Sequence, residues 1–457
     1  MTGRYKAYPE YKESGVEWLG KVPQDWSIHS LKRTVDRVTN GIWGSEPDSE
    51  NDLIVLRVAD FNRNQLNISD DKLTFRSIDP KDRSARLLKK GDLLIEKSGG
   101  GDKTLVGCVV LFDKEYPAVT SNFVAKMTPQ QGFDSSFLRY AFSKLYAGKV
   151  NFPSIKQTTG IQNLDSDAYL LESFAFPSFE EQQKIANFLD HETAKIDTLI
   201  TKQEKLIELL KEKRQAVISH AVTKGLNPDA PMKDSGVEWL GDVPEHWVVA
   251  QLKINTVLMQ TGPFGSQLHA EDYVEGGIPL INPAHMIDGK IIPDMKVTVD
   301  IETQERLCRH KLSKGDIIFA RRGELGRCAI VQSNQVGWLC GTGSLKATLN
   351  ERLIPEYAYL LITSEGVTAE LSLESKGSTM DNLNTETLGK IRTPVPPTQE
   401  QLAILDYVND VSGKYKRLIE NAVLAIKLMK ERKTALISAA VTGKIDVRDW
   451  DAQGVQG

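Results

Sequence analysis

The chain has 457 residues, of which 40% are hydrophobic and 26% are charged, and its formal net charge is −4. This length exceeds what one ordinary hydrophobic core accommodates, so two domains with connecting elements are expected. The negative net charge excludes a chain that coats nucleic acid over its whole surface, because such binding requires an excess of Lys and Arg. Any contact with DNA must therefore be local.

The sequence shows no membrane, secretory or metal-binding signal. Its apolar runs are too short to span a bilayer, and the N-terminal residues MTGRYKAYPEYKESG contain no apolar core of a signal peptide. No CxxC pair or HExxH spacing is present, although there are four cysteines: Cys108, Cys308, Cys328 and Cys340. We therefore expect a reduced cytoplasmic protein without structural zinc and without a cofactor.

The chain is an internal repeat. The segment from Lys12 to Trp26, KESGVEWLGKVPQDW, returns as KDSGVEWLGDVPEHW 221 residues later, and we call these two segments the clips. Shorter islands recur at similar shifts: GIWGS (41–45) as GPFGS (262–266), KKGDLLIEKSGG (89–100) as SKGDIIFARRGE (313–324), IQNL (161–164) as MDNL (380–383), and LLKEKRQAVISHAVTKG (209–225) as LMKERKTALISAAVTGK (428–444). Clips and helix ends repeat closely while the middles diverge, which predicts two modules with one framework and different surfaces.

The clips contain four of the seven tryptophans: Trp18, Trp26, Trp239 and Trp247. Stacking on exposed bases is one interpretation of these side chains. The polar flanks and the GVEWLG turn favour the other, in which the tryptophans pack each clip onto the rest of the protein.

Each module contains one basic cluster. Residues 81–103 hold seven Lys or Arg against four acidic residues, and residues 306–327 hold seven against two. Each cluster alone is explained equally well by a solvated surface and by a DNA contact.

The first copy also contains carboxylates that invite a catalytic interpretation. Asp92 and Glu96 beside Lys97 suggest a metal-dependent nuclease, which needs paired acids. The second copy keeps Asp316 but has Ala320 where the second acid would be, so we interpret Asp92 and Asp316 as turn residues that precede the buried strands LLI and IIF.

Two other motifs fail for lack of required residues. SGGGDKT around Lys103 lacks a glycine of the phosphate-binding loop, and Asn282-Pro283 lacks the aromatic residue and the glycine-rich loop of an amino-methyltransferase.

Two long helices are predicted, each after a proline. Ser178 with Glu181, and Thr398 with Gln401, match capping boxes. Apolar residues then follow a heptad spacing in both helices: Ile185, Leu189, Ile196, Leu199, Leu206, Leu210 and Val217, then Ile404, Val408, Val411, Tyr415, Leu418, Ala422, Ala425, Met429 and Leu436. Glu192, Gln203, Lys213 and Arg432 interrupt this seam.

A helix over residues 180–221 extends roughly 60 Å, so one small domain cannot cover its apolar stripe, and the two helices are expected to pair. The second module lies between the end of the first helix and the start of the second. A parallel pair would force that module to bridge the full helix length, so an antiparallel pair is expected, with the end of the second helix near the first clip.

The clips, the GPFGS and KGDIIFARRG islands, the xNL element and the P-x-x-x-E-Q helix starts at Pro177 and Pro396 together resemble Type I restriction specificity subunits. The resemblance covers essentially the whole chain. It implies an α+β fold with two mixed α/β target-recognition domains, joined by two long antiparallel coiled-coil helices in a pseudo-two-fold repeat. The expected parts are residues 1–177, 178–224, 225–395, 396–445 and a tail, 446–457.

The resemblance also implies the function and the partners. The chain would be a non-catalytic subunit whose two modules each recognise half of a bipartite site in double-stranded DNA. Two methyltransferase subunits would dock on the helices, from Ser178 to Ala221 and from Thr398 to Ala440, and restriction or translocase subunits would join through the complex. The helices would set the gap between the half-sites, and no membrane is involved.

The predicted DNA-facing residues lie on loops that follow the buried strands. They are Lys97, Ser98 and Lys103 in the first module and Arg321, Arg322 and Arg327 in the second, with Asn122, Lys126, Ser344 and Lys346 as further candidates. The first copy departs from the family pattern, because GIWGS replaces GPFGS and IEKSGG replaces FARRGE.

Two other classes of protein were weighed. A coiled-coil scaffold that binds only protein explains the helices but not two different surfaces on one framework. A free-standing nuclease or methylase is disfavoured by the missing motifs.

Overall fold

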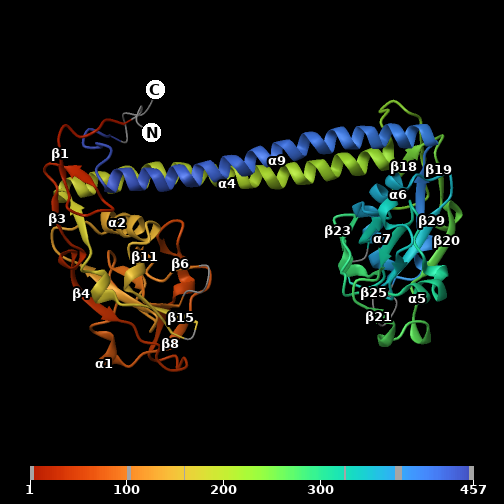
Figure 1. The fold of residues 1–457 in the computed structure, drawn as a ribbon. Helices are drawn as coiled ribbons and strands as arrows, with labels where there is room; N and C mark the ends of the chain where they lie inside the picture. The colour runs from red at the N-terminus through yellow and green to blue at the C-terminus, as the bar shows by residue number, and fades with distance from the viewer. Residues whose placement is uncertain (1–4, 100–103, 159, 324–325, 376–382, 452–457) are drawn as a thin grey trace. The chain divides into compact units, whose positions relative to one another are not determined.

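The computed structural model describes residues 5–99, 104–158, 160–323, 326–375 and 383–451. The chain forms two compact units, Met1–Gln203 with Leu424–Gly457 and Glu204–Val423 (Figure 1). Two long helices, α4 (Phe179–Lys224) and α9 (Thr398–Val441), each contribute one end to each unit. We call residues 27–177 module 1 and residues 248–396 module 2.

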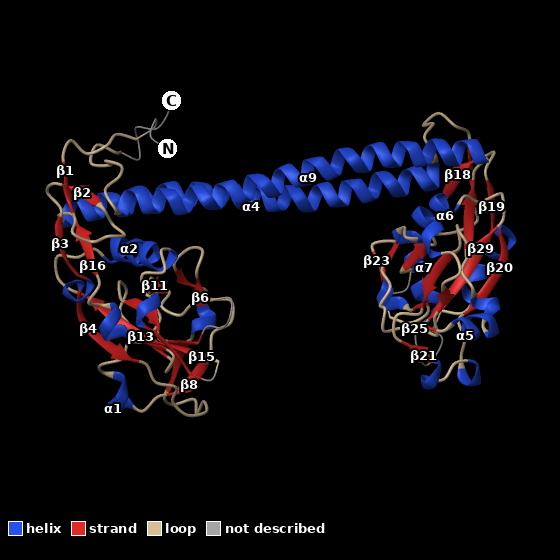
Figure 2. Ribbon diagram, in the orientation of Figure 1, coloured by secondary structure: helices blue, strands red, loops and turns tan. Residues whose placement is uncertain are grey.

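Module 1 is built around a six-stranded sheet in the order β4-β13-β9-β11-β7-β6. Its strands are β4 (Val35–Asn40), β13 (Val124–Pro129), β9 (Leu93–Glu96), β11 (Val109–Leu111), β7 (Asn67–Ile68) and β6 (Phe61–Asn62). Helix α2 (Ser135–Ala147) lies between this sheet and the start of α4 (Figure 2).

Module 2 repeats the first four strands of that order, as β20-β29-β26-β27. These are β20 (Thr256–Thr261), β29 (Ser344–Leu349), β26 (Ile317–Ala320) and β27 (Cys328–Ile330), and α6 (Pro355–Ile362) takes the place of α2. The predicted mixed α/β repeat is thus confirmed.

Smaller elements complete each module. Module 1 also contains β3 (Ser27–Ser30), β5 (Asp52–Leu56), β8 (Phe75–Ser77), α1 (Pro80–Arg83), β10 (Ser98–Gly99), β12 (Ala118–Thr120), β14 (Ile155–Thr158), β15 (Ile161–Leu164), α3 (Ser166–Tyr169) and β16 (Ser173–Phe176). Module 2 contains β19 (Val248–Gln251), β21 (Tyr273–Val274), β22 (Ile278–Ile281), β23 (Met286–Ile287), β24 (Lys290–Ile291), β25 (Thr298–Val299), α5 (Ile301–Arg306), β28 (Leu339–Cys340), α7 (Glu365–Ser375), α8 (Thr385–Lys390) and β30 (Arg392–Val395). The clips form the hairpins β1 (Tyr11–Glu13) with β2 (Lys21–Pro23) and β17 (Met232–Asp234) with β18 (Asp242–Pro244).

The strand β9 shows why its sequence is a continuous apolar run. Leu93 and Ile95 face the core that contains α2 and the long helices, while Leu94 faces a second core on the other side of the sheet. Successive side chains of a strand point to opposite faces, so a strand covered on both faces must be apolar throughout. Strand β26 is covered in the same way.

The helices run antiparallel where they meet in the first unit. Lys184 near the start of α4 donates to the carbonyl of Arg448 (2.9 Å), whereas Asp197, further along α4, pairs with Lys433 of α9 (2.7 Å). Increasing position in α4 therefore matches decreasing position in the C-terminal segment. In the second unit the other ends of the helices, at Val222 and Ile404, share one core.

The predicted seam is correct at most positions and wrong at three. Leu199, Leu206 and Leu418 are 47%, 42% and 51% exposed, and Ile200 is buried beside the position predicted for Leu199. A strict heptad drifts on an α-helix of 3.6 residues per turn, so the buried face moves to the next residue.

The start of each long helix is held by a buried glutamine. Gln182 accepts a hydrogen bond from the Asp134 backbone N–H (2.9 Å) and donates to the carbonyl of Pro177 (3.0 Å). Gln401 accepts from the Ile354 N–H (2.9 Å) and donates to the carbonyls of Pro396 (2.9 Å) and Arg352 (2.7 Å).

The predicted capping boxes are wrong. Ser178 does accept the Glu181 N–H (3.3 Å), but the Glu181 carboxylate accepts from Tyr8 and Trp26 and not from the cap. Thr398 is already the first residue of α9, and the Gln401 side chain is used as described above.

Each clip contacts the C-terminal end of a long helix. Lys444, just after α9, donates to the carbonyl of Lys21 in the first clip (2.5 Å), and Lys224, at the end of α4, donates to the carbonyl of Asp242 in the second. Gly443 has a positive φ of 67°, and a Cβ there would lie 2.3 Å from Pro23. The C-terminal end of α9 thus meets the first clip, as predicted.

The tryptophans of the clips are packing residues, as the sequence favours. Trp26 and Trp247 are buried, at 1% and 0% exposure. Trp18 stacks on Phe174 with ring centroids 6.0 Å apart, and Trp239 donates to Glu370 (2.5 Å). Across the described ranges, no helix has the length and apolar character needed to cross a bilayer.

The buried glutamines give a first test. Replacing Gln401 with Met keeps the side-chain length but removes the partner of one N–H and two carbonyls, of which the bond to the Pro396 carbonyl is fully buried. We expect Gln401→Met to lower the free energy of unfolding by about 2–4 kcal/mol. Gln399→Met, at an exposed position two residues earlier, is the matched control and should change it by less than about 0.5 kcal/mol. Calorimetric unfolding of both variants measures the change in stability. Equal losses of stability in the two variants would contradict the structural role of Gln401.

Candidate nucleic-acid interface

Four segments meet at one edge of each module. In module 1 the Lys97 N–H donates to the carbonyl of Phe123 (2.8 Å), and the Lys97 carbonyl accepts the N–H of Leu164 (2.7 Å). In module 2 Arg321 makes the same two bonds, to Gly343 (2.9 Å) and from Leu383 (2.8 Å). We call this surface the loop edge: residues 41–43, 97–99, 121–123 and 161–163 in module 1, and residues 262–264, 321–323, 341–343 and 383 in module 2.

The repeated islands of the sequence are the parts of this junction. The leucine of each xNL element docks on the loop that follows the central strand. The first glycine of GIWGS is required by close approach, because a Cβ at Gly41 would lie 2.1 Å from the carbonyl oxygen of Ser121. At Gly262 of GPFGS the corresponding distance, to the carbonyl of Gly341, is 1.8 Å.

Three predicted residues of module 1 lie at its loop edge. Lys97 is half-buried and donates to the Asn40 side chain (2.7 Å), Ser98 donates to Asn163 (2.6 Å), and Asn122 is exposed. Lys103 lies outside the described residues. These hydrogen bonds within the protein fix the orientation of the Lys97 and Ser98 side chains.

In module 2 the predicted arginines lie on the loop between β26 and β27. Arg321 is half-buried and its Nε donates to the carbonyl of Leu383 (3.3 Å), while Arg322 and Arg327 are exposed. The Arg327 carbonyl accepts the N–H of Ala320 (2.9 Å). Arg322 is therefore an exposed cation directly at the loop edge.

The predictions for Lys126 and Lys346 require correction, because these side chains are 9% and 4% exposed. Lys126 donates to the carbonyl of Leu87 (3.0 Å), and Lys346 donates to the carbonyl of Lys311 and lies 3.7 Å from Asp316. Burial lowers the pKa of Lys126, although Asp92 nearby opposes that shift. Both lysines belong to the interior.

Ser344 also requires correction. It is fully buried and pairs with Ala320 in the sheet, just as Val124 pairs with Glu96. The position that corresponds to Asn122 is therefore Thr342, which is exposed.

The aspartates before the central strands are turn residues, as predicted. Asp92 accepts the Lys89 N–H (2.7 Å) and the Thr128 hydroxyl (3.0 Å). Asp316 accepts the Ser313 N–H (2.8 Å) and the Thr348 hydroxyl (2.7 Å). Their oxygens hold the turn to the neighbouring strand.

Glu96 of module 1 forms a buried ion pair, and Ala320 occupies the corresponding position of module 2. The Glu96 carboxylate is fully buried and accepts from Arg63 (2.7 Å), directly before Lys97 of the loop edge. Burial raises the pKa of Glu96, although the pairing with Arg63 opposes the rise. Within the described ranges, no group of three His, Cys, Asp or Glu residues is placed to hold a metal ion.

The sequence analysis missed the exposed aromatic residues of the loop edge. Trp43 is 38% exposed and Phe264 is 64% exposed. Each directly precedes the second glycine of its repeated segment, GIWGS or GPFGS. Phe123 is 52% exposed beside Asn122. The available signal was an aromatic residue between two glycines, present in both copies.

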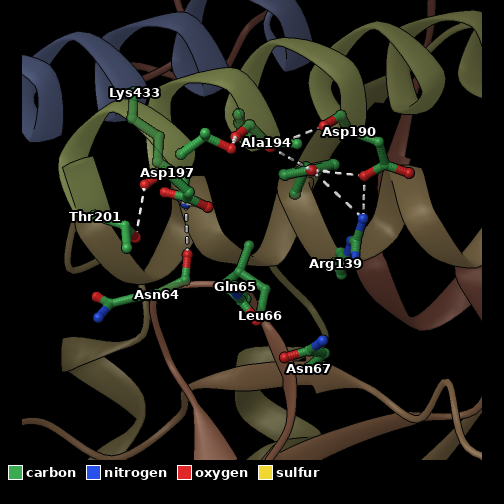
Figure 3. A pocket seen from close by; sticks show the side chains of 13 residues that line it. Asn64, Gln65, Leu66, Asn67, Arg139, Asp190, Ala194, Asp197, Thr201 and Lys433 are labelled. Carbon is green, nitrogen blue, oxygen red and sulfur yellow. Dashed lines mark hydrogen bonds and ion pairs between the residues drawn. The ribbon is translucent and has the colours of Figure 1, made fainter.

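Module 1 is fixed to the long helices by charged side chains that line a cavity of about 370 Å³ (Figure 3). Lys433 of α9 donates to the carbonyl of Asn64 in the β6–β7 turn (2.8 Å) as well as to Asp197 of α4. Arg139 and Tyr140 of α2 both donate to Asp190 of α4. These charges are paired with one another, so the cavity serves to position the module.

The duplicated fold agrees with what comparison with known proteins shows. The family model of the Type I restriction modification DNA specificity domain matches the chain twice, at residues 51–209 and 252–428. The chain therefore belongs to the family of Type I restriction-modification specificity subunits, whose role is DNA recognition. It is a non-catalytic subunit, as its relatives are.

Curated relatives match along nearly the whole chain. The specificity subunit of the Type I restriction enzyme EcoKI from Escherichia coli K12 is 23% identical, over 95% of this chain and 92% of the relative. The putative MjaX specificity subunit from Methanocaldococcus jannaschii is 22% identical, over 96% and 98%.

Solved structures share the fold. A chain from a study of complex assembly and conformational transition of the type I R-M system aligns with a TM-score of 0.67 at 13% identity, covering 92% of this chain and 98% of that one. The HsdS subunit from Thermoanaerobacter tengcongensis aligns with a TM-score of 0.55 at 13% identity, covering 93% and 98%.

The buried ion pair gives a second test. Replacing Arg63 with Met leaves the Glu96 carboxylate buried without its cation and should cost about 3–5 kcal/mol of stability at pH 8. The pKa of Glu96 in the folded variant is then raised further above its unfolded value. Stability is therefore retained below the unfolded pKa and lost as the pH rises through the folded pKa, so the cost should shrink at pH 5.

The control for this test is the double variant Arg63→Met, Glu96→Ala, which copies Ala320 of module 2. It removes the buried charge and should show no such pH dependence. Urea unfolding of both variants at the two pH values measures the effect, and a pH-independent loss in Arg63→Met would contradict the argument.

Proposed function

We propose that this chain recognises a bipartite site in double-stranded DNA, with one half-site contacted by the loop edge of each module. The observation that carries the proposal is the duplicated junction: the same backbone bonds hold Lys97 and Arg321, while the exposed side chains around them differ. A common framework with different edges is what two different half-sites require.

We propose further that the helices α4 and α9 dock two methyltransferase subunits, and that restriction or translocase subunits join the complex. Exposed leucines along both helices support this docking role, because solvent-facing helix positions of this kind are normally polar. They are Leu199, Leu206, Leu209, Leu402, Leu418, Leu424 and Leu428.

The DNA-binding proposal predicts a position-dependent loss of affinity. Arg321→Ala with Arg322→Ala should cost on the order of 2–5 kcal/mol in DNA binding, because charge-assisted contacts are lost, while assembly with the methyltransferase persists. Since Arg321 also holds Leu383, Arg322→Ala alone is the variant that leaves the junction intact.

The matched control is Arg309→Ala with Lys314→Ala, which removes the same charge from exposed positions of the same basic cluster, away from the loop edge. Gel-shift titrations of the assembled complex on its target compare the variants. Equal effects of the two pairs would assign the basic cluster a general electrostatic role, and unchanged binding by both would favour the protein-only scaffold.

The helix pair should also set the gap between the half-sites. The variant has one heptad inserted between Gln203 and Glu204 and a second between Ile426 and Lys427. These two points lie opposite each other if the antiparallel register is counted from the Lys433–Asp197 pair. Each heptad adds roughly 10 Å at 1.5 Å per residue, which is about three base pairs at 3.4 Å of rise.

Methylome mapping of this lengthened chain should give the same two half-sites with a longer gap, or no methylation if the rotated modules cannot both engage the duplex. A chain with an insertion in α4 alone is the control, since it breaks the register. An active lengthened chain with an unchanged gap would contradict the helix pair as the ruler.

A further inference from the structure

The loop edge of module 1 contains an apolar pocket of about 510 Å³. Its apolar walls are Trp43, Phe123 and Ile161, which come from three separate segments and are 38%, 52% and 49% exposed. Such a cluster of large apolar side chains in contact with solvent marks an interaction site.

Polar groups surround this pocket and fix its shape. Arg76 lies over the Trp43 ring, 5.0 Å from its centroid, and pairs with Glu46 (2.7 Å). Arg57, another lining residue, is held by Asp60 (2.9 Å), and Ser98 is held by Asn163. The lining is therefore preorganised, and the exposed amide of Asn122 stands at its rim.

Among the residues that the structure describes, module 2 lacks one wall of this pocket. In the shared framework, the position of Phe123 is occupied by Gly343 in module 2, so the wall that Phe123 provides has no counterpart there. The position of Ser98 is occupied by Arg322, an exposed cation. A surface that differs between the modules at the same place is where the difference in recognition must arise.

The chemical groups on the surface of a DNA duplex indicate which of them this apolar pocket can bind. Phosphates and sugars favour cationic and polar partners, and most base edges present hydrogen-bonding groups. In the major groove only thymine presents an apolar group, its C5-methyl. A concave apolar surface rimmed by an amide suits that methyl group, with the amide left for a neighbouring base edge.

We propose that Trp43, Phe123 and Ile161 receive the C5-methyl group of one thymine in the half-site of module 1, and so determine specificity at that position. This inference rests on the proposed DNA-binding function. The side chains act by excluding water from the methyl group, and a cytosine or uracil at that position would leave the apolar walls against solvent.

The test uses the full chain in its methyltransferase complex and a target identified by methylome mapping. Each thymine of the target is replaced in turn by uracil, which removes only the methyl group. One replacement in the half-site of module 1 should weaken binding by about 3- to 10-fold. Replacements in the half-site of module 2 should show no effect that depends on Phe123.

The variant Phe123→Gly, which copies Gly343, should bind thymine and uracil duplexes equally at that position while it keeps binding through phosphate contacts. Phe152→Ala removes another exposed phenylalanine of module 1, 61% exposed and outside the pocket, and should keep the discrimination. The uracil replacements are tested on the unaltered chain. They therefore show whether a thymine methyl group is recognised even if Phe123→Gly fails to fold.

Several results would overturn the inference. They are a module 1 half-site without thymine on either strand, a uracil series without any effect, and discrimination that persists in Phe123→Gly. A rise in the fluorescence of 2-aminopurine that depends on Phe123, with no effect of uracil, would instead assign Phe123 as a wedge between bases. If the complex methylates no bipartite target, the proposed function itself fails, whereas a mapped target without a methyl effect removes only this pocket.

Discussion

The constraint on which the rest of the structure depends is that the first compact unit, Met1–Gln203 with Leu424–Gly457, completes its core only with the C-terminal part of the chain. In the first unit, Ile185 and Leu189 of α4 share a core with Leu436 and Ala440 of α9. The hydrophobic effect rewards burial of these residues only if the C-terminal helix returns antiparallel to the first. The contact of Lys444 with the first clip follows from the same return path, whereas Lys224 meets the second clip because that clip directly follows α4.

In both modules the buried framework is the same, whereas the exposed side chains of the loop edge differ. Asp92 with Thr128 and Asp316 with Thr348 are buried polar pairs that hold the same turn in both modules. Buried polar groups must keep their partners, so substitution there is costly. At the loop edge the backbone bonds, the docking leucine and the close-packed first glycine are shared. The exposed side chains there can change from Phe123 to a glycine, or from Ser98 to an arginine, without loss of the framework.

The sequence predicted the repeat, the buried central strands and the antiparallel helices because each rests on a local pattern or on chain connectivity. It could not predict the burial of Lys126, since that depends on the carbonyl of Leu87, which is distant in sequence. Ser344 was assigned to the surface because the strand register that pairs it with Ala320 is invisible in the sequence. The pocket of Trp43, Phe123 and Ile161 joins three distant segments, so no single motif could reveal it.

The two loop edges also differ in how they can contribute to binding. Arg322 is an exposed cation, and contacts of such a residue with phosphate release counterions and weaken as salt rises. In module 1 Lys97 is held by Asn40, and Trp43, Phe123 and Ile161 are exposed apolar side chains of the loop edge. Contacts of that kind depend on the fit between surfaces more than on ionic strength. Under the proposed function, a chain with a net charge of −4 binds DNA locally, and we expect module 2 to supply more of the electrostatic attraction and module 1 more of the shape-dependent contact.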